Sequence, residues 1–120
     1  MKKIPDSELE IMMVIWEADG EVTSDYIIER LDKDWAKPTV LNFLSRLCER
    51  GYLECEKRSR LNYYRPTVGI DEYRKSALGD FMARLFHNSP SSLIASLWDG
   101  GTISESEREE LKRFIENGGN

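Results

Sequence analysis

The stretch KPTVLNFLSRLCERGYL, from Lys37 to Leu53, restricts the fold most strongly, because it predicts a helix with a marked start and a marked end. Pro38 stands where proline is tolerated, at the first helical position, and Gly51 stands where helices commonly end in a left-handed residue. Beyond Gly51 the apolar period changes from that of a helix to that of strands. The pattern there predicts two short strands around the polar turn 57–62.

Two further helices are predicted before this one. The first has two candidate caps, either Asp6 or Ser7 with Glu10 as a capping box, and is expected to end at Gly20. The second, VTSDYIIERL, is expected to begin at a Thr23 cap. Three helices followed by a two-stranded ribbon are typical of a winged helix-turn-helix, so the predicted fold class is mainly α, or α+β.

The remainder of the chain is predicted to form three short helices. Their expected starts are Asp71, Ser89 with Pro90, and the capping box of Ser104 with Glu107. Because such short helices cannot easily close a core of their own, we expect them to be buried against a second copy of the chain. The sequence therefore predicts a winged-helix domain at residues 1–70 and a helical dimerisation region at residues 71–120. The apolar side chains expected at the dimer interface are Tyr73, Phe81, Leu85, Leu93, Leu97, Leu111, Phe114 and Ile115.

The third helix has two different faces when about 100° is allowed for each residue. Its apolar arc, expected in the core, holds Val40, Phe43, Leu44, Leu47 and Cys48. Its polar arc holds Thr39, Asn42, Ser45, Arg46 and Glu49, with Leu41 at the margin. Such side chains can hydrogen-bond base edges, touch a thymine methyl group or clamp a phosphate. A solvated polar face is the alternative explanation.

The charge distribution favours local binding to a polyanion over coating of nucleic acid. The formal net charge is -5, yet from Lys37 to Arg65 seven cations stand against three anions, a local balance of +4. Lys57, Arg58 and Arg60 lie at the predicted turn, where a wing can contact the sugar-phosphate backbone. A charged turn is also a common way to keep a hairpin soluble.

Several other classes of protein find no support in the sequence. No apolar run approaches the roughly 18 residues of a membrane span, and the N-terminus has no apolar signal region, so a cytoplasmic protein without membrane insertion is expected. The two cysteines, Cys48 and Cys55, are most simply small core residues. With His87 as the only histidine and no catalytic motif, we expect no metal, no cofactor and no enzymatic activity.

The pattern W-x-K-P-T-V-x-x-x-L-x-R-L-x-x-R-G-Y-L, followed by Y-Y-R-P, resembles the penicillinase-repressor family, which includes methicillin-resistance and copper-responsive repressors. The segments ELEIMMVIW and SESEREELK resemble the first and last helices of that family. The resemblance implies a homodimeric repressor whose winged helices bind the two halves of a palindromic DNA operator. The residues then expected to contact DNA are Lys37, Thr39, Leu41, Asn42, Ser45, Arg46, Arg58 and Arg60.

The chain also departs from this family pattern. Pro38 stands where penicillin-responsive members have a lysine, and Leu41 where they often have a polar residue, so the base preference should differ. A membrane sensor protease cuts those members in a region that matches SLIASLWDG, but Ser96 and Leu97 replace the expected asparagine and aromatic residue. No cysteine follows Cys55, so the paired CxC motifs of copper-responsive members are missing.

A second function stays open on the sequence alone. A winged helix can serve as a protein interaction module that does not bind DNA, with the same face on an acidic protein partner. The acidic total charge is the observation behind this alternative.

Overall fold

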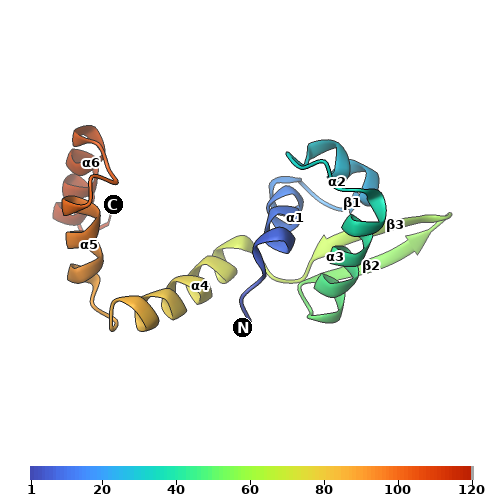
Figure 1. The fold of residues 1–120 in the computed structure, drawn as a ribbon, viewed down its shortest axis with the longest axis horizontal. Helices are drawn as coiled ribbons and strands as arrows, with labels where there is room; N and C mark the ends of the chain where they lie inside the picture. Colours follow the sequence, from blue (N-terminus) through green and yellow to red (C-terminus); the bar gives the residue numbers. More distant parts are fainter. Residues whose placement is uncertain (120) are drawn as a thin grey trace. The chain divides into compact units, whose positions relative to one another are not determined.

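The computed structural model of the chain describes residues 1–119, and within them it contains six helices and three strands (Figure 1). In chain order they are α1 (Asp6–Glu17), β1 (Val22–Thr23), α2 (Ser24–Arg30), α3 (Lys37–Glu49), β2 (Leu53–Arg58), β3 (Leu61–Pro66), α4 (Ile70–Leu85), α5 (Pro90–Asp99) and α6 (Glu105–Glu116). The predicted helix-rich winged helix-turn-helix is confirmed.

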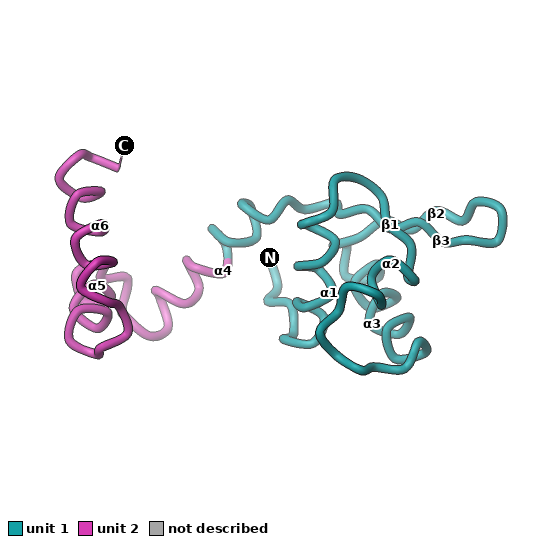
Figure 2. Tube along the Cα trace, turned by 90° about the horizontal axis from the view of Figure 1, so that it is seen from above, with its two compact units in different colours: residues 1–76 teal, residues 77–120 magenta. Residues whose placement is uncertain are grey.

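The chain divides into two compact units, shown in two colours in Figure 2. The N-terminal unit comprises Met1–Ser76, and the C-terminal unit begins at Ala77. The first six residues beyond the expected boundary at 70/71 therefore pack with the N-terminal unit. The roles assigned from the sequence to residues 1–70 and 71–120 stay predictions.

The sheet has three antiparallel strands in the order β1-β3-β2. β2 and β3 form the predicted ribbon, which we call the wing, and Pro66 lies opposite Leu53 at its base. β1 was not predicted, because a strand of two residues carries no recognisable period. It pairs Val22 with Tyr64 and so ties the start of α2 to the sheet.

The core of the N-terminal unit lies between α1, α2, α3 and the sheet. Ile11, Met12 and Ile15 of α1 and Leu44 and Leu47 of α3 are at most 1% exposed. Their spacing of three and four residues turns one apolar stripe of each helix inward. The apolar arc predicted for α3 is thus confirmed, although Phe43 and Cys48 at its edges are only half-buried.

Tyr73 belongs to this core and not to the surface where the sequence placed it. Its hydroxyl accepts a hydrogen bond from the backbone N–H of Ile4 at 2.8 Å, and its ring packs on Trp16 and Tyr52 with centroid distances of 5.7 and 6.1 Å. Only 6% of Tyr73 is exposed, so a second copy of the chain has no access to the ring. We therefore leave Tyr73 out of the expected dimer interface. The ring instead anchors the first turns of α4.

The helix starts were predicted with mixed success. Thr23, Ser89 and Ser104 each accept a backbone N–H as predicted, and Ser104 forms the full capping box with Glu107. Hydrogen bonds from the backbone and side chain of Ser104 hold the pKa of Glu107 below its usual range.

The predicted start of α1 was wrong. The helix begins after Pro5 without a side-chain cap, because Asp6 and Ser7 already lie inside it. It also ends at Glu17, three residues before the expected Gly20. Likewise Asp71 lies within the first turn of α4 and does not cap it.

The cysteine prediction was wrong for Cys55, which is exposed, while Cys48 is half-buried. Burial raises the pKa of the Cys48 thiol. The difference arises because β2 leaves the core after Leu53, so that each later residue of the strand is exposed.

The C-terminal unit has no core of comparable quality. Neither α5 nor α6 contains a buried residue. Arg108 joins the two helices, since its Nη2 atom donates to the carbonyl oxygen of Trp98 at 2.5 Å. The large apolar side chains that stay exposed in this unit are Leu78, Phe81, Leu85, Phe114 and Ile115. Among residues 1–119, no helix has the length and apolar character that crossing a membrane would require.

Candidate nucleic-acid interface

α3 presents the predicted polar face on the surface of the N-terminal unit. Asn42, Ser45 and Arg46 are exposed, whereas Thr39 and Leu41 are half-buried at the edges of the face. The Arg46 guanidinium lies 5.8 Å from the centroid of the Phe43 ring. This contact steadies the stem of Arg46 and leaves its N–H groups free to donate to an acceptor outside the chain.

The first residue of α3 is held by α2. Lys37 Nζ lies 3.0 Å from Asp25 Oδ1, and this ion pair is exposed on both sides. Pro38 follows directly in the first turn, where its missing N–H costs no helical hydrogen bond. Lys37 would have to leave or share this exposed contact in order to reach a phosphate.

The turn of the wing lies at the free end of the ribbon, as Figures 1 and 2 both show. Ser59 and Arg60 have positive φ angles of 49° and 75°, the backbone geometry of a two-residue hairpin turn. Such a turn normally favours Asn or Gly, so two other residues here make a tight but strained tip. Arg60 at this tip is exposed.

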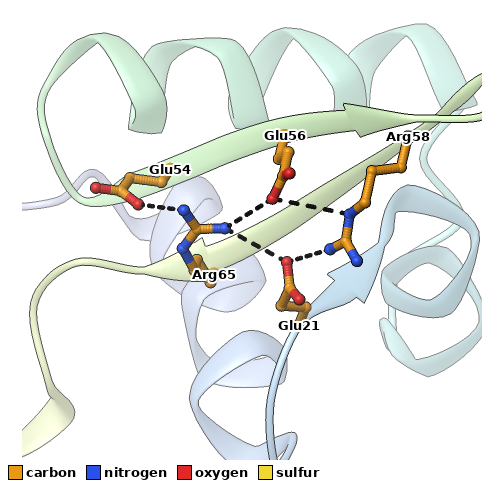
Figure 3. A network of polar contacts seen from close by, with 5 residues as sticks. All are labelled: Glu21, Glu54, Glu56, Arg58 and Arg65. Atoms are coloured by element: carbon orange, nitrogen blue, oxygen red, sulfur yellow. Dashed lines mark hydrogen bonds and ion pairs between the residues drawn. The ribbon is translucent and has the colours of Figure 1, made fainter.

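Arg58, predicted to contact DNA, is already engaged inside the chain (Figure 3). Its guanidinium forms an ion pair with Glu21, lies 3.7 Å from Glu56 and stands 4.1 Å above the ring of Tyr63. The hydrogen bond to Glu21 is the main cause that raises the pKa of Arg58. Arg65 joins the same cluster, and the nearby Glu54 carboxylate, at 2.7 Å, is the main cause that raises its pKa.

The local excess of positive charge is therefore smaller than the sequence count indicates. Of the seven cations between Lys37 and Arg65, four form ion pairs within the chain: Lys37, Arg50, Arg58 and Arg65. The structure of residues 1–119 shows no such partner for Arg46, Lys57 or Arg60. These three cations, one on α3 and two at the wing tip, are the ones left for a polyanion.

Sequence reasoning missed the acidic partners. Glu8, Asp25 and Glu21 each pair with at least one of the cations counted above, yet each lies at least 12 residues from its partner along the chain. No local motif marks such a pair. The one usable signal is that Glu8 occupies a position on the apolar stripe of α1, where an unpaired carboxylate is unfavourable.

The expected interface residues of the C-terminal unit fall into two groups. Leu93, Leu97 and Leu111 are half-buried. Phe81, Leu85, Phe114 and Ile115 are 42 to 64% exposed. Ser96 is exposed and Leu97 half-buried, and both lie in the last turn of α5, so the peptide bond between them is helical. Over residues 1–119 no group of His, Cys, Asp and Glu side chains is arranged to hold a metal ion.

Comparison with known proteins identifies the family. The family model described as "Penicillinase repressor" matches residues 4–117. The penicillinase repressor of Bacillus licheniformis is 30% identical over 121 residues, which cover 97% of this chain and 94% of the relative.

Two solved structures are similar to this chain over about three fifths of its length. The DNA-binding domain of the repressor BlaI is 33% identical, with a TM-score of 0.52, and covers 61% of this chain and 94% of its own. Monomeric Bacillus licheniformis BlaI in complex with the blaP half-operator is 31% identical, with a TM-score of 0.51. The match covers 60% of this chain and 89% of the BlaI chain. The match along nearly the whole sequence means that this chain belongs to the penicillinase repressor family.

Proposed function

We propose that this chain is a transcriptional repressor that binds a palindromic operator as a homodimer, with α3 as its recognition helix. The observation that carries the proposal is the uncommitted polar face of α3 in a chain of this family. The similar protein BlaI has been solved on a half-operator, which supports the same mode of binding here.

Within this proposal, Asn42, Ser45 and Arg46 contact base edges or phosphates in the major groove. Thr39 and Leu41 flank them, and the half-buried Leu41 side chain suits a thymine methyl group better than a polar base edge. Lys37 begins the helix near the phosphate backbone once it leaves Asp25. The wing adds phosphate contacts, which orient the protein without specifying sequence.

We assign dimerisation to the C-terminal unit. Its helices leave Phe81, Leu85, Phe114 and Ile115 exposed, and monomeric proteins rarely leave several large apolar side chains uncovered together. A second copy related by a twofold axis would cover them and place two recognition helices on a palindromic operator.

Replacing Arg46 by alanine is expected to weaken operator binding by about fivefold or more, since loss of one arginine contact costs at least about 1 kcal/mol. The duplex for this measurement is first recovered by selecting genomic fragments that the full chain binds. Binding of the wild type should weaken steeply between about 50 and 200 mM salt, with a log-log slope of several units.

Arg30→Ala is the matched control for Arg46→Ala. It removes an exposed arginine of α2 that pairs within its own helix, with Glu29 at 3.7 Å and the Tyr26 ring at 3.5 Å. Equal affinities of the two variants would remove Arg46 from the interface. A wild type that selects no fragment at either salt concentration, but holds a stable protein partner on pull-down, would support the protein interaction module instead.

We further propose that a membrane sensor protease relieves repression by cutting α5, as the family resemblance implies. Proteases bind extended backbone, so the helical bond between Ser96 and Leu97 must first unfold locally. When this chain is expressed together with the membrane sensor protease, it should be cut into two fragments at the bond between Ser96 and Leu97. A chain that stays intact while its target gene is induced would exclude this partner.

A further inference from the structure

Four charged side chains of the wing and one from the segment before β1 form a connected cluster, and the contacts proposed for the operator use none of its acidic members. Glu21, Glu54 and Glu56 surround Arg58 and Arg65 in the close view of Figure 3. Arg65 lies 3.4 Å from both Glu21 and Glu56, so Glu21 touches both arginines. Each guanidinium thus has more than one acidic partner.

The cluster lies on the face of the ribbon that is turned away from α3. Successive side chains of a strand point to opposite faces, so Leu53, Cys55 and Lys57 of β2 share one face. Leu53 is 3% exposed and belongs to the core against which α3 packs, which places Lys57 on the α3 side. The side chains of Glu54, Glu56 and Arg58 alternate with these and occupy the opposite face.

Glu21 connects the wing to the helix-turn-helix. It directly precedes β1, which leads into α2, whereas Arg58 is the last residue of β2 before the turn. β1 pairs with β3 only at Val22 and Thr23, so the outer part of the ribbon consists of β2 and β3 alone, without a third strand beside them. The ion pair between Glu21 and Arg58 is therefore a side-chain brace between that outer part and the segment that enters α2.

We propose that Glu21 and Arg58 are positioning residues that hold the wing in a fixed orientation to the helix-turn-helix, and that Lys57 and Arg60 make the phosphate contacts of the wing. The inference rests on the proposed operator binding and refines it. Lys57 is on the α3 side and Arg60 is at the tip, and neither has an ion-pair partner within residues 1–119. Arg58 would have to leave Glu21 and the Tyr63 ring to reach DNA.

The competing arrangement is that Glu21 competes with DNA for Arg58. The two arrangements predict opposite effects of Glu21→Ala on the affinity for the operator. If Glu21 braces the wing, Glu21→Ala loosens it and weakens binding, because DNA must then order the wing. If Glu21 competes with phosphate, the same change frees Arg58 and strengthens binding.

The test measures the affinity of full-length variants for the selected operator duplex at several salt concentrations. Glu21→Ala and Arg58→Ala are each expected to weaken binding about 2- to 10-fold, the cost of ordering one or two side chains. The salt slope should stay unchanged in both variants. Lys57→Ala and Arg60→Ala should each lower it by about 1.8, because each substitution removes one phosphate contact, worth about 0.9, from each of the two bound subunits.

Two further variants sharpen the result. The double variant Glu21→Ala/Arg58→Ala should bind no more weakly than Arg58→Ala, because both changes remove the same brace. Glu29→Ala is the control for Glu21→Ala. It removes the negative charge of an exposed glutamate on α2, away from the wing, and so measures how a change of net charge alone affects operator affinity. Melting temperatures of all variants identify any that fail to fold.

A salt slope that falls by about 1.8 in Arg58→Ala would overturn the inference, since Arg58 of each subunit would then contact a phosphate. Tighter binding by Glu21→Ala than by Glu29→Ala would overturn it as well. In either case the wild type still binds its operator with salt-dependent affinity. Failure of the proposed function itself would instead appear as a wild type that selects no duplex.

Discussion

Replacing Leu85 and Ile115 together by glutamate is expected to convert the dimer into monomers and to weaken operator binding by about a hundredfold or more. The two side chains are 64% and 53% exposed in one chain, so the change should hardly affect the folding of a monomer. In a dimer that buries the surface still exposed on these two side chains, each contributes roughly 1 to 2 kcal/mol, and the substituted glutamates would place charges in the interface. Light scattering reports the oligomeric state.

Loss of the dimer lowers operator affinity because the two winged helices are then no longer linked. In a dimer, once one winged helix is bound, the other binds the second half-site in an intramolecular step. That linkage raises affinity by about 10² to 10⁴ without any new contact. Binding to a single half-site should change little, which separates loss of dimerisation from damage to α3.

Ala83→Glu with Ser106→Glu is the matched control for this variant. At about 100° per residue, Ala83 lies on the far side of α4 from Leu85, and Ser106 lies on the far side of α6 from Ile115. Both control positions are exposed. A dimer that survives the change of Leu85 and Ile115 but not the control would move the interface to the opposite faces of these helices.

Replacing Arg50 by methionine is expected to lower the free energy of unfolding of the N-terminal unit by about 2 kcal/mol. Arg50 Nη1 donates to Glu8 Oε1 at 2.7 Å, and the side chain of Glu8 is 2% exposed while that of Arg50 is 41% exposed. Removal of the arginine leaves a carboxylate among the apolar side chains of α1. A buried charge without its partner is costlier than the loss of the pair itself.

The double variant Glu8→Met/Arg50→Met should recover most of the lost stability, because both charges are then replaced by apolar groups. Urea unfolding at a fixed chain concentration measures all three proteins, since dimerisation also contributes to stability. Arg30→Met serves as the control, because the exposed pair of Arg30 with Glu29 should contribute almost nothing. If Arg50→Met is no less stable than Arg30→Met, the buried pair provides no net stabilisation.

The ion pair of Arg50 shows the limit of counting charges along the sequence. Its position after α3 suggested a role in a basic stretch, but its guanidinium is committed to a residue 42 positions earlier in the chain. The same holds for Arg58, whose partner Glu21 is 37 positions away. A count along the sequence treats every cation as available for binding. A cation that already forms an ion pair within the chain is neutralised and is less available to a polyanion.

Most features that depend on neighbouring residues were predicted correctly, although the starts of α1 and α4 were not. The Thr23 cap, the capping box of Ser104 and Glu107, and the left-handed Gly51 after α3 are all present. Each follows from hydrogen bonds or steric limits within about four residues. The apolar period of α3 and the family pattern likewise lie within the sequence itself, so the winged helix and the family could both be predicted from it.

Only the tertiary structure decided which distant segments of the chain pair with one another. It placed Tyr73 in the core of the N-terminal unit through its contact with Ile4, added β1 to the sheet, and assigned an acidic partner to four of the seven cations. The physical reason is that such contacts depend on which surfaces meet after the helices pack, and many glutamates along the chain could satisfy one arginine equally well. The sequence determined the elements and their faces, and the packing of those elements determined which charges remain for DNA.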